Sequence, residues 1–127
     1  MIRIPIVNEQ DEVICYKIRE ETTREDIHRI VGLDVFNEKG EVLLAKRHHN
    51  KIIHPDLWGP SVAGTVDEGY CYDDTVVKEA EEEIGLIDVE PIFVSKYFYE
   101  TENTRRWCSR YYVLINSRER ERASKAG

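Results

Sequence analysis

The chain has 127 residues, of which 41% are hydrophobic and 34% charged, with a mean hydropathy of −0.53. This length suits one domain, residues 1–127, and the apolar share excludes wholesale disorder. No apolar run approaches the ~18 residues that a membrane span needs. With 18 Lys+Arg against 25 Asp+Glu the net charge is −7, so no overall positive field attracts nucleic acid. An anionic substrate therefore requires a local basic patch, a bound cation, or both.

The amino terminus and the cysteines favour a cytoplasmic protein. Residues 1–5 alternate in polarity and lack the continuous apolar segment of a signal peptide. Cys15, Cys71 and Cys108 are odd in number and show no C-x-x-C spacing, which disfavours a disulfide framework and a zinc ribbon. We expect them to be small, partly buried structural residues.

The amino-terminal part is predicted to form strands joined by short polar segments. The strand-like runs are residues 4–7, 13–18, 27–36 and 42–45. Residues 8–11 read as a hairpin turn, and residues 20–26 as a loop or short helical turn. The turn that contains Gly40 joins the last two runs so tightly that we expect them to pair antiparallel.

The carboxyl-terminal part adds a helix and further strands. The predicted strands are residues 61–66, 89–99 and 107–115. A helix is predicted from about Thr75 to Ile84, ended by Gly85, and the charged tail 117–127 reads as a peripheral, solvated end. Strands outnumber helices, so the predicted class is α+β, a mixed sheet with a helix packed on it.

The predicted helix carries the residues best suited to chemistry. Glu79 and Glu83 are i, i+4 neighbours, and Glu82 lies three residues after Glu79, so their carboxylates cluster. They lie beside an apolar face made of Val76, Val77, Ala80 and Ile84. Because like charges repel, a hard divalent cation such as Mg²⁺ is a natural partner, and it can bridge phosphates and activate water. The helix alone favours a solvated glutamate-rich surface. The glycine-bounded loop 64–69 before it favours a site, because the main chain there can approach a metal or phosphate closely.

Residues 64–86, GTVDEGYCYDDTVVKEAEEEIGL, resemble the Nudix box, the loop–helix–loop signature G-x5-E-x7-R-E-U-x-E-E-x-G-U, in which U is bulky and aliphatic. The matching residues are Gly64, Glu79, Glu82, Glu83, Gly85 and Leu86, with Ala80 as a small stand-in. The segment departs from the box at Tyr70, where the family has Glu, and at Lys78, where it has Arg. Residues 28–64 look like the Nudix subgroup that includes isopentenyl-diphosphate isomerase, so the resemblance covers most of the chain.

The resemblance implies an α/β/α sandwich that cleaves a diphosphate linked to another moiety, with Mg²⁺ or Mn²⁺. By the same resemblance Glu79 and Glu83 would be the principal metal ligands. Glu82 would ligate a second ion or orient the water, and the carbonyl of Gly64 would complete a coordination shell. Lys78 keeps the positive charge of the family's Arg but lacks its planar fork, so weaker metal binding is expected. At i, i+4 from Glu82, Lys78 can still pair with that carboxylate.

Substrate-binding residues are expected in the loop 46–60. In the isomerase subgroup an Arg and a Lys four residues apart grip the diphosphate, and Arg47 and Lys51 occupy the matching places. A solvated surface cation is an equal alternative for each. Trp58 either covers the substrate or anchors the loop against the sheet, and the second is favoured because the same Trp occurs with a non-aromatic substrate.

Three further residues lie near a predicted turn, and they either add to an anion-binding patch or are simply exposed. They are Arg105, Arg106 and Trp107. His28 falls where the isomerase subgroup has a metal-ligating His, and without the other ligands we interpret it as structural.

Two hypotheses of different classes follow. The first is a hydrolase of a diphosphate linkage in a nucleoside diphosphate derivative or a similar small molecule, favoured by the retained carboxylates. The second is a Nudix domain without catalysis that binds a ligand or partner, favoured by Tyr70 and Lys78. Isomerase activity is disfavoured, because its catalytic Cys falls at Ala63 and a metal-ligating His at Thr65. We expect a small-molecule partner and no nucleic acid or membrane. The oligomeric state, a homodimer included, is left open.

Overall fold

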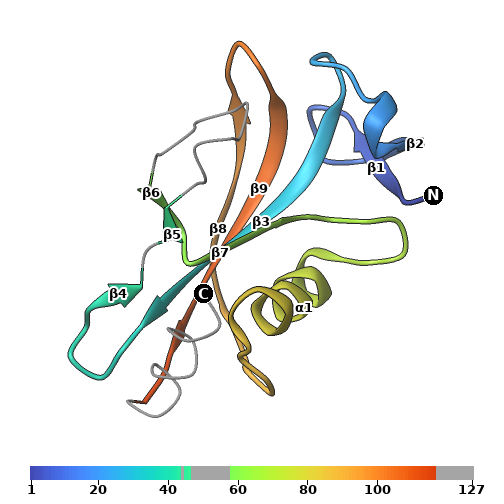
Figure 1. Cartoon of the computed structure of the whole chain (residues 1–127). Coiled ribbons are helices and arrows are strands. Elements are labelled where there is room, and N and C mark those ends of the chain that lie inside the picture. The colour runs from blue at the N-terminus through green and yellow to red at the C-terminus, as the bar shows by residue number, and fades with distance from the viewer. Residues whose placement is uncertain (44, 47–57, 117–127) are drawn as a thin grey trace.

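The computed structural model describes residues 1–43, 45–46 and 58–116. Within them a mixed sheet runs in the order β2-β1-β3-β9-β8, and β4 and β7 also pair with β3. The strands are β1 (Arg3–Val7), β2 (Val13–Ile18), β3 (Ile27–Phe36), β4 (Val42–Leu43), β7 (Val62–Thr65), β8 (Ile92–Glu100) and β9 (Arg105–Leu114). A separate ladder joins β5 (Ala45–Lys46) to β6 (Trp58–Gly59). The helix α1 (Tyr72–Ile84) packs on one face of the sheet (Figure 1), and the short 3₁₀ helix η1 (Arg19–Glu21) follows β2.

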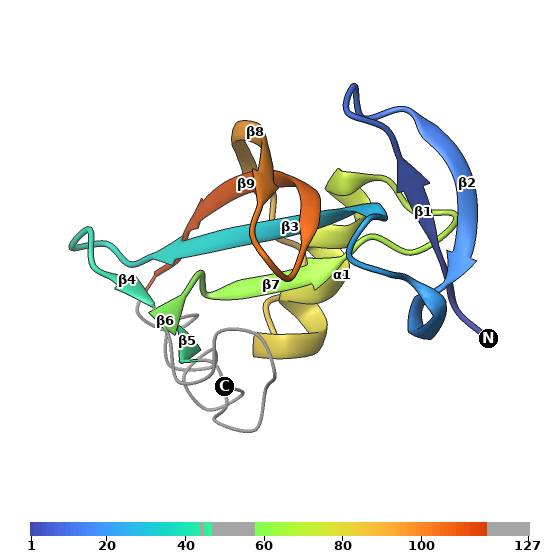
Figure 2. The same ribbon diagram turned by 90° about the horizontal axis from the view of Figure 1, so that it is seen from above.

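Strand β3 is the centre of the sheet. It pairs in parallel with β9 along its whole length, from Ile27 opposite Arg105 to Phe36 opposite Leu114. Its other edge pairs antiparallel with β1, β7 and β4 in turn. Figure 2 shows β7 beside β3, with β9 on the opposite side of β3. Because β3 has partners on both edges, an apolar sequence suits it.

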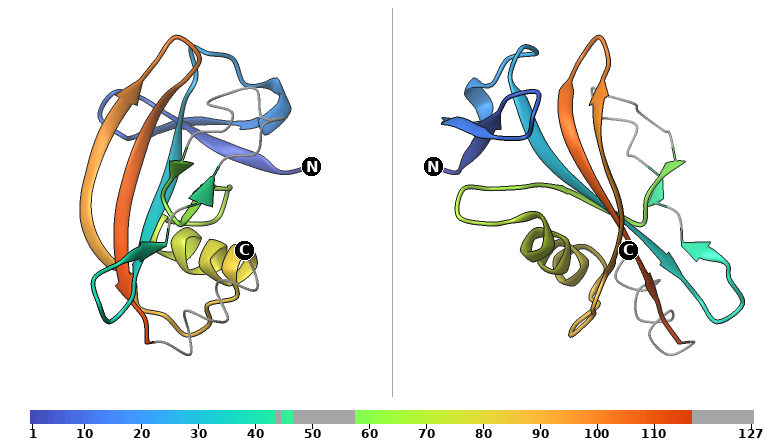
Figure 3. Two further views of the ribbon diagram at one scale, coloured as in Figure 1. Left: turned by 60° about the vertical axis from the view of Figure 1, so that its left-hand side comes forward. Right: turned by 180° about the vertical axis from the view of Figure 1, so that it is seen from behind.

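The core lies between the sheet and α1, which Figure 3 shows as two layers. Alternate residues of β3, namely Val31, Leu33 and Val35, point to this side and are at most 1% exposed. The other buried members are Val62, Val66, Val76, Ala80, Ile84, Leu86, Tyr111, Val113 and Ile115. Burying these side chains is the main stabilising contribution to the fold, since each Val, Leu or Ile among them is worth roughly 1.5–3 kcal/mol.

Helix α1 begins earlier than the sequence predicts. Cys71 caps its amino terminus, because its Sγ accepts a hydrogen bond from the main-chain N–H of Asp74 at 3.4 Å. Cysteine is an unusual capping residue, so the preference for Ser, Thr, Asp or Asn gave no signal here. The predicted end is confirmed: Gly85 has φ +70, and its N–H donates to the carbonyl of Glu81 at 3.0 Å.

Several expectations are confirmed and others need correction. The predictions of β1, β2, β3 and β7 are confirmed, whereas β8 begins at Ile92 rather than residue 89 and β9 at Arg105 rather than residue 107. The predicted strand 42–45 is divided between β4, which pairs with β3, and β5, which pairs with β6 in the segment predicted as a loop. Val77 is 38% exposed and lies outside the buried helix face, because it sits 100° around the helix from Val76. Cys15 and Cys71 are exposed rather than partly buried. The described residues carry one α-helix, so they do not include a second helical layer, and the tail 117–127 lies outside them. None of the described helices is long and apolar enough to cross a membrane.

A carboxylate in the β1–β2 turn ties this hairpin to the rest of the molecule. Asp11, whose side chain is 6% exposed, accepts hydrogen bonds from Arg29 Nε at 2.8 Å, Lys96 Nζ at 2.7 Å and the Tyr72 hydroxyl at 3.0 Å. These partners come from β3, β8 and α1 respectively. The two cations and the hydroxyl lower the pKa of Asp11, although burial opposes them. The carboxylate therefore stays ionised at neutral pH and holds three elements together.

Asp11→Asn is expected to lower the free energy of unfolding by about 2 kcal/mol at pH 7, because it leaves Arg29 and Lys96 without their anion. The pKa of Asp11 is lowered in the folded state, so its contribution is present above the unfolded pKa of about 3.8 and is lost as the pH falls. The difference between the variant and the wild type should therefore shrink in acid. Urea denaturation at several pH values measures this.

Asp88→Asn is the matched control, because Asp88 also has positive φ but is exposed. If both variants lose the same stability, the effect belongs to the left-handed backbone rather than to the ion pairs of Asp11.

Candidate active site

The site is built where α1 crosses β7. A Cβ added at Gly64 would lie 2.6 Å from both Cγ and Cδ of Glu79. The Glu79 side chain therefore rests directly against the β7 main chain, and only glycine leaves room for it. The sequence predicted a close approach at this glycine, and the structure brings Gly64 and Glu79 together.

Glu83 reaches the same strand one residue earlier. Its Oε2 accepts a hydrogen bond from the main-chain N–H of Ala63 at 3.2 Å. This N–H is free to donate because, among the described residues, β7 pairs with β3 alone and is an edge strand. The two carboxylates, one helical turn apart, are thus both directed at the main chain of residues 63–64.

The two carboxylates hold their protons more tightly than ordinary glutamates do. The pKa of Glu83 is raised to about 7, chiefly by desolvation and also by the negative charges of Glu79 and Glu82, while the Ala63 hydrogen bond opposes the rise. The pKa of Glu79 is also raised, by desolvation and then by the charge of Glu82. Glu82 itself is exposed and contributes through its charge. Such mutual repulsion is what a bound cation would relieve.

The two departures from the Nudix box contact each other. The ammonium of Lys78 lies 4.9 Å from the centre of the Tyr70 ring, a cation–π distance, and 3.6 Å from the carboxylate of Asp67. The expectation that Lys78 would pair with Glu82 is therefore wrong: its ion pair is with Asp67. Its charge still reaches Glu79, whose pKa it lowers. Lys78 is thus held in place by an aromatic face and a carboxylate from the preceding loop.

The oxygen donors present here fit a hard divalent cation. Glu79 and Glu83 supply carboxylates, and the absence of a side chain at Gly64 lets Glu79 pack against the β7 main chain. Across the described parts of the chain, no three His, Cys, Asp or Glu side chains converge as a ready-made metal site. Mg²⁺ is usually held by one or two carboxylates and completed by water and substrate phosphates, so two protein carboxylates are sufficient.

The described structure does not test three of the other predicted site residues. Arg47 and Lys51 lie outside the described residues, and of Trp58 only the main chain in β6 is described. His28 lies on β3, and the pKa of its imidazole is lowered to about 4 by burial and then by the charges of Arg106 and Arg19. It is therefore neutral at pH 7.

Sequence reasoning missed two partners of the site, the N–H of Ala63 and the carboxylate of Asp67. The first is a main-chain group, and every residue except proline has one, so the sequence gives no signal for it. Asp67 lies in the loop before α1, and only the path of this loop brings it to Lys78.

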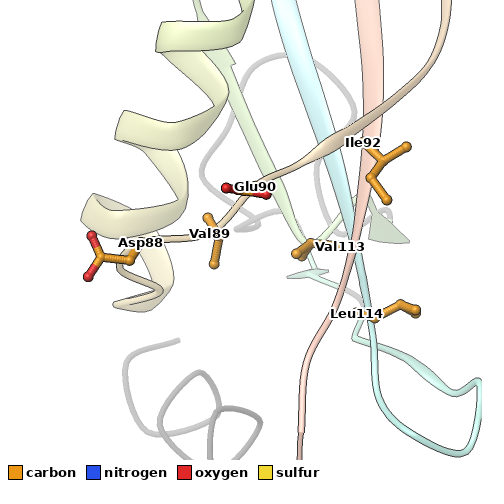
Figure 4. Close-up of a pocket in the computed structure, with 6 residues that line it drawn as sticks. All are labelled: Asp88, Val89, Glu90, Ile92, Val113 and Leu114. Atoms are coloured by element: carbon orange, nitrogen blue, oxygen red, sulfur yellow. The ribbon is translucent and has the colours of Figure 1, made fainter.

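A pocket of about 360 Å³ lies elsewhere, beyond the carboxyl end of α1 (Figure 4). Its lining residues are Asp88, Val89, Glu90, Ile92, Val113 and Leu114. None of the clustered residues of α1 and β7 lines it, so it is separate from the candidate site.

Comparison with known proteins identifies the class to which this fold and site belong. The NUDIX domain family model matches residues 26–125, so the chain belongs to the Nudix family. The expectation from the box is thereby confirmed at the level of the family.

Two curated relatives agree with this assignment. The chain is 32% identical over 113 residues to the uncharacterised Nudix hydrolase SCO1686 of Streptomyces coelicolor, covering 87% of this chain and 62% of that protein. It is 29% identical over 105 residues to the uncharacterised Nudix hydrolase YfcD of Escherichia coli K12, covering 82% and 58%. The chain spans less than two thirds of the length of either relative.

Solved structures share the fold. The crystal structure of DR0079 from Deinococcus radiodurans superposes with a TM-score of 0.74 at 23% identity, covering 91% of this chain and 73% of that chain. A MutT protein from Methanosarcina mazei Go1 gives 0.63 at 22% identity, covering 70% and 64%. The predicted α+β class and the Nudix fold are confirmed.

Gly64→Ala is expected to lower the free energy of unfolding by about 1–3 kcal/mol, because its Cβ collides with the Glu79 side chain. Combining it with Glu79→Ala, which removes the colliding atoms, should restore much of the loss. Urea denaturation of the two single variants and the double variant measures the coupling. If the double variant loses the sum of the unfolding free energies that the two single variants lose, the close contact between Gly64 and Glu79 is contradicted.

In the metal-free protein, Glu83 is expected to titrate at about 7 instead of 4.5. The folded state then binds this proton more tightly than the unfolded chain, so the group stabilises the fold below pH 4.5, and its contribution is lost as the pH rises through 7. Carbon-13 NMR of labelled glutamate carboxyls measures the pKa. Glu79→Gln, which removes a neighbouring charge, should lower it. An ordinary pKa for Glu83 in the wild type would contradict the desolvation described above.

Proposed function

We propose that this Nudix protein is a divalent-metal-dependent hydrolase of a diphosphate linkage in a nucleoside diphosphate derivative or a similar small molecule. The observation that carries the proposal is the convergence of Glu79 and Glu83 on the β7 main chain at residues 63–64. The two neighbouring carboxylates have raised pKa values and repel each other, and a divalent cation would relieve this repulsion. Such a cation would also favour the binding of a diphosphate at the same place.

Each residue of the proposed site has a distinct part. Glu79 and Glu83, with the carbonyl of Gly64, hold Mg²⁺ or Mn²⁺, and the exposed Glu82 ligates a second ion or orients the attacking water. A bound ion supplies charge neutralisation at the diphosphate and lowers the pKa of coordinated water.

Substrate binding is proposed for Arg47 and Lys51, with Trp58 beside them, on the resemblance to the isomerase-like subgroup alone. The chemistry of that subgroup's isomerase is not proposed. Ala63 offers only a methyl group where an acid or base is needed, and the Thr65 hydroxyl accepts a hydrogen bond from Arg19 Nη2 at 3.3 Å.

The alternative is a Nudix domain that binds a ligand without cleaving it. Tyr70 in place of a carboxylate makes the site less negative, which favours this alternative. Against it, Lys78 remains fixed beside the box by Asp67 and Tyr70, so a cation is still held next to Glu79. The retained charge arrangement favours the enzyme.

The test is release of phosphate or nucleotide from a panel of nucleoside diphosphate derivatives, with Mg²⁺ or Mn²⁺ and then with excess chelator. Turnover that the chelator abolishes is expected. Glu79→Gln and Glu83→Gln should each lower kcat by about 100-fold, because a neutral amide is a much weaker metal ligand. Their melting temperatures should change little.

Glu81→Gln is the matched control, since Glu81 is an exposed glutamate on the same helix that the structure does not direct at β7. It should keep wild-type turnover. A folded protein that cleaves no member of the panel with either metal would support the ligand-binding alternative. Unchanged turnover in both Glu79→Gln and Glu83→Gln would overturn the proposed metal site.

A further inference from the structure

The sheet face opposite α1 carries an arginine without an acidic partner. Arg106 on β9 points to this face, and its Nε is buried with no hydrogen-bond partner in the described structure. Its guanidinium lies 5.2 Å from the centre of the Tyr99 ring, which orients it by stacking but leaves its charge unneutralised. A buried guanidinium donor without an acceptor is costly unless a ligand supplies one.

A second guanidinium lies close by. Arg19, in η1, donates to the Thr65 hydroxyl at 3.3 Å and forms no ion pair within the described residues. In the parallel pairing of β3 with β9, Arg106 lies directly opposite His28, and Thr65, which Arg19 contacts, lies opposite Ile30, two residues further along β3. Burial, and then the charges of Arg106 and Arg19, lower the pKa of the His28 imidazole. The negative charge of Asp26 acts in the opposite direction and raises the pKa of His28, but this carboxylate is already paired with Lys17 Nζ at 3.0 Å.

The neighbouring arginines of β9 have acidic partners. Arg105 pairs with Glu100 at 2.7 Å. Arg110 pairs with Asp34 at 2.9 Å, although its Nε, like that of Arg106, is buried with no hydrogen-bond partner in the described structure. Most cations of this acidic protein for which the structure describes contacts are thus neutralised locally. Among the arginines that the structure describes in this acidic chain, Arg19 and Arg106 are the two that form no ion pair.

We propose that Arg19 and Arg106, on either side of His28, form a binding site for a phosphate group. Two guanidiniums match the charge of a phosphate that carries about −2 near neutral pH, and each presents a planar fork suited to its oxygens. The neutral imidazole adds an N–H donor. The two positive charges disfavour a metal ion at His28.

The position of Arg19 connects this site to the carboxylates. Thr65, which Arg19 contacts, follows Gly64 directly, and the charge of Arg19 lowers the pKa of Glu79. We assign to the pair the phosphate end of a substrate whose linkage reacts at Glu79 and Glu83. That assignment rests on the proposed function, whereas phosphate binding by the two arginines does not.

The experiment titrates inorganic phosphate into the protein with chelator present, at pH 7.5 and constant ionic strength, and follows the His28 imidazole by NMR. Saturable shifts and a raised pKa of His28 are expected, because a bound anion offsets the two positive charges. Arg106→Gln and Arg19→Gln should each weaken binding by about 10-fold or more. Arg106→Lys, which keeps the charge but not the fork, should fall between Arg106→Gln and the wild type.

Lys39→Gln is the charge-matched control, because Lys39 is an exposed cation in the turn between β3 and β4. It should change binding by less than about two-fold, since an exposed distant charge is screened. No saturable binding, equal weakening by Lys39→Gln, or equally tight binding of acetate would overturn the phosphate site. Because no metal or hydrolysis is involved, these outcomes leave the proposed function to its own test.

Discussion

The candidate site depends on how closely α1 approaches β7. Gly64 has no side chain, so the aliphatic part of Glu79 lies against the strand itself. On the core side, the small buried side chain of Ala80 allows the same helix to pack close to the sheet. Because α1 is also fixed by the apolar contacts of Val76 and Ile84, its carboxylates cannot move away from β7 without disturbing the core. Packing thus holds like charges together against their repulsion.

The positive charge beside this contact is retained although two residues differ from the family pattern. Where a carboxylate and an arginine would face each other, Tyr70 and Lys78 do so through a cation–π contact, and Asp67 supplies the anion. The cation beside Glu79 is therefore retained while one negative charge is lost.

The sequence predicted the elements well where local rules decide them. Alternation of polar and apolar residues located the strands. Gly85 marked the end of α1 because helices commonly end at a residue in the left-handed conformation, which glycine adopts easily. The convergence of Glu79 with Gly64 followed from the box. The Asp11 network, the Lys78–Asp67 pair and the clustering of Arg19 with Arg106 did not, because each depends on contacts between segments far apart in the chain. Helical spacing alone suggested the wrong partner for Lys78.

The parallel pairing of β3 with β9 has a consequence for biosynthesis. The central strand emerges from the ribosome before its full-length partner, which is the last strand of the described residues to be made. Until residues 105–114 are available, the nascent chain presents an apolar strand with one edge unpaired and no completed core. Non-local strand pairing of this kind is also slow to form. The growing polypeptide is therefore most in need of chaperone protection between the synthesis of β3 and that of β9.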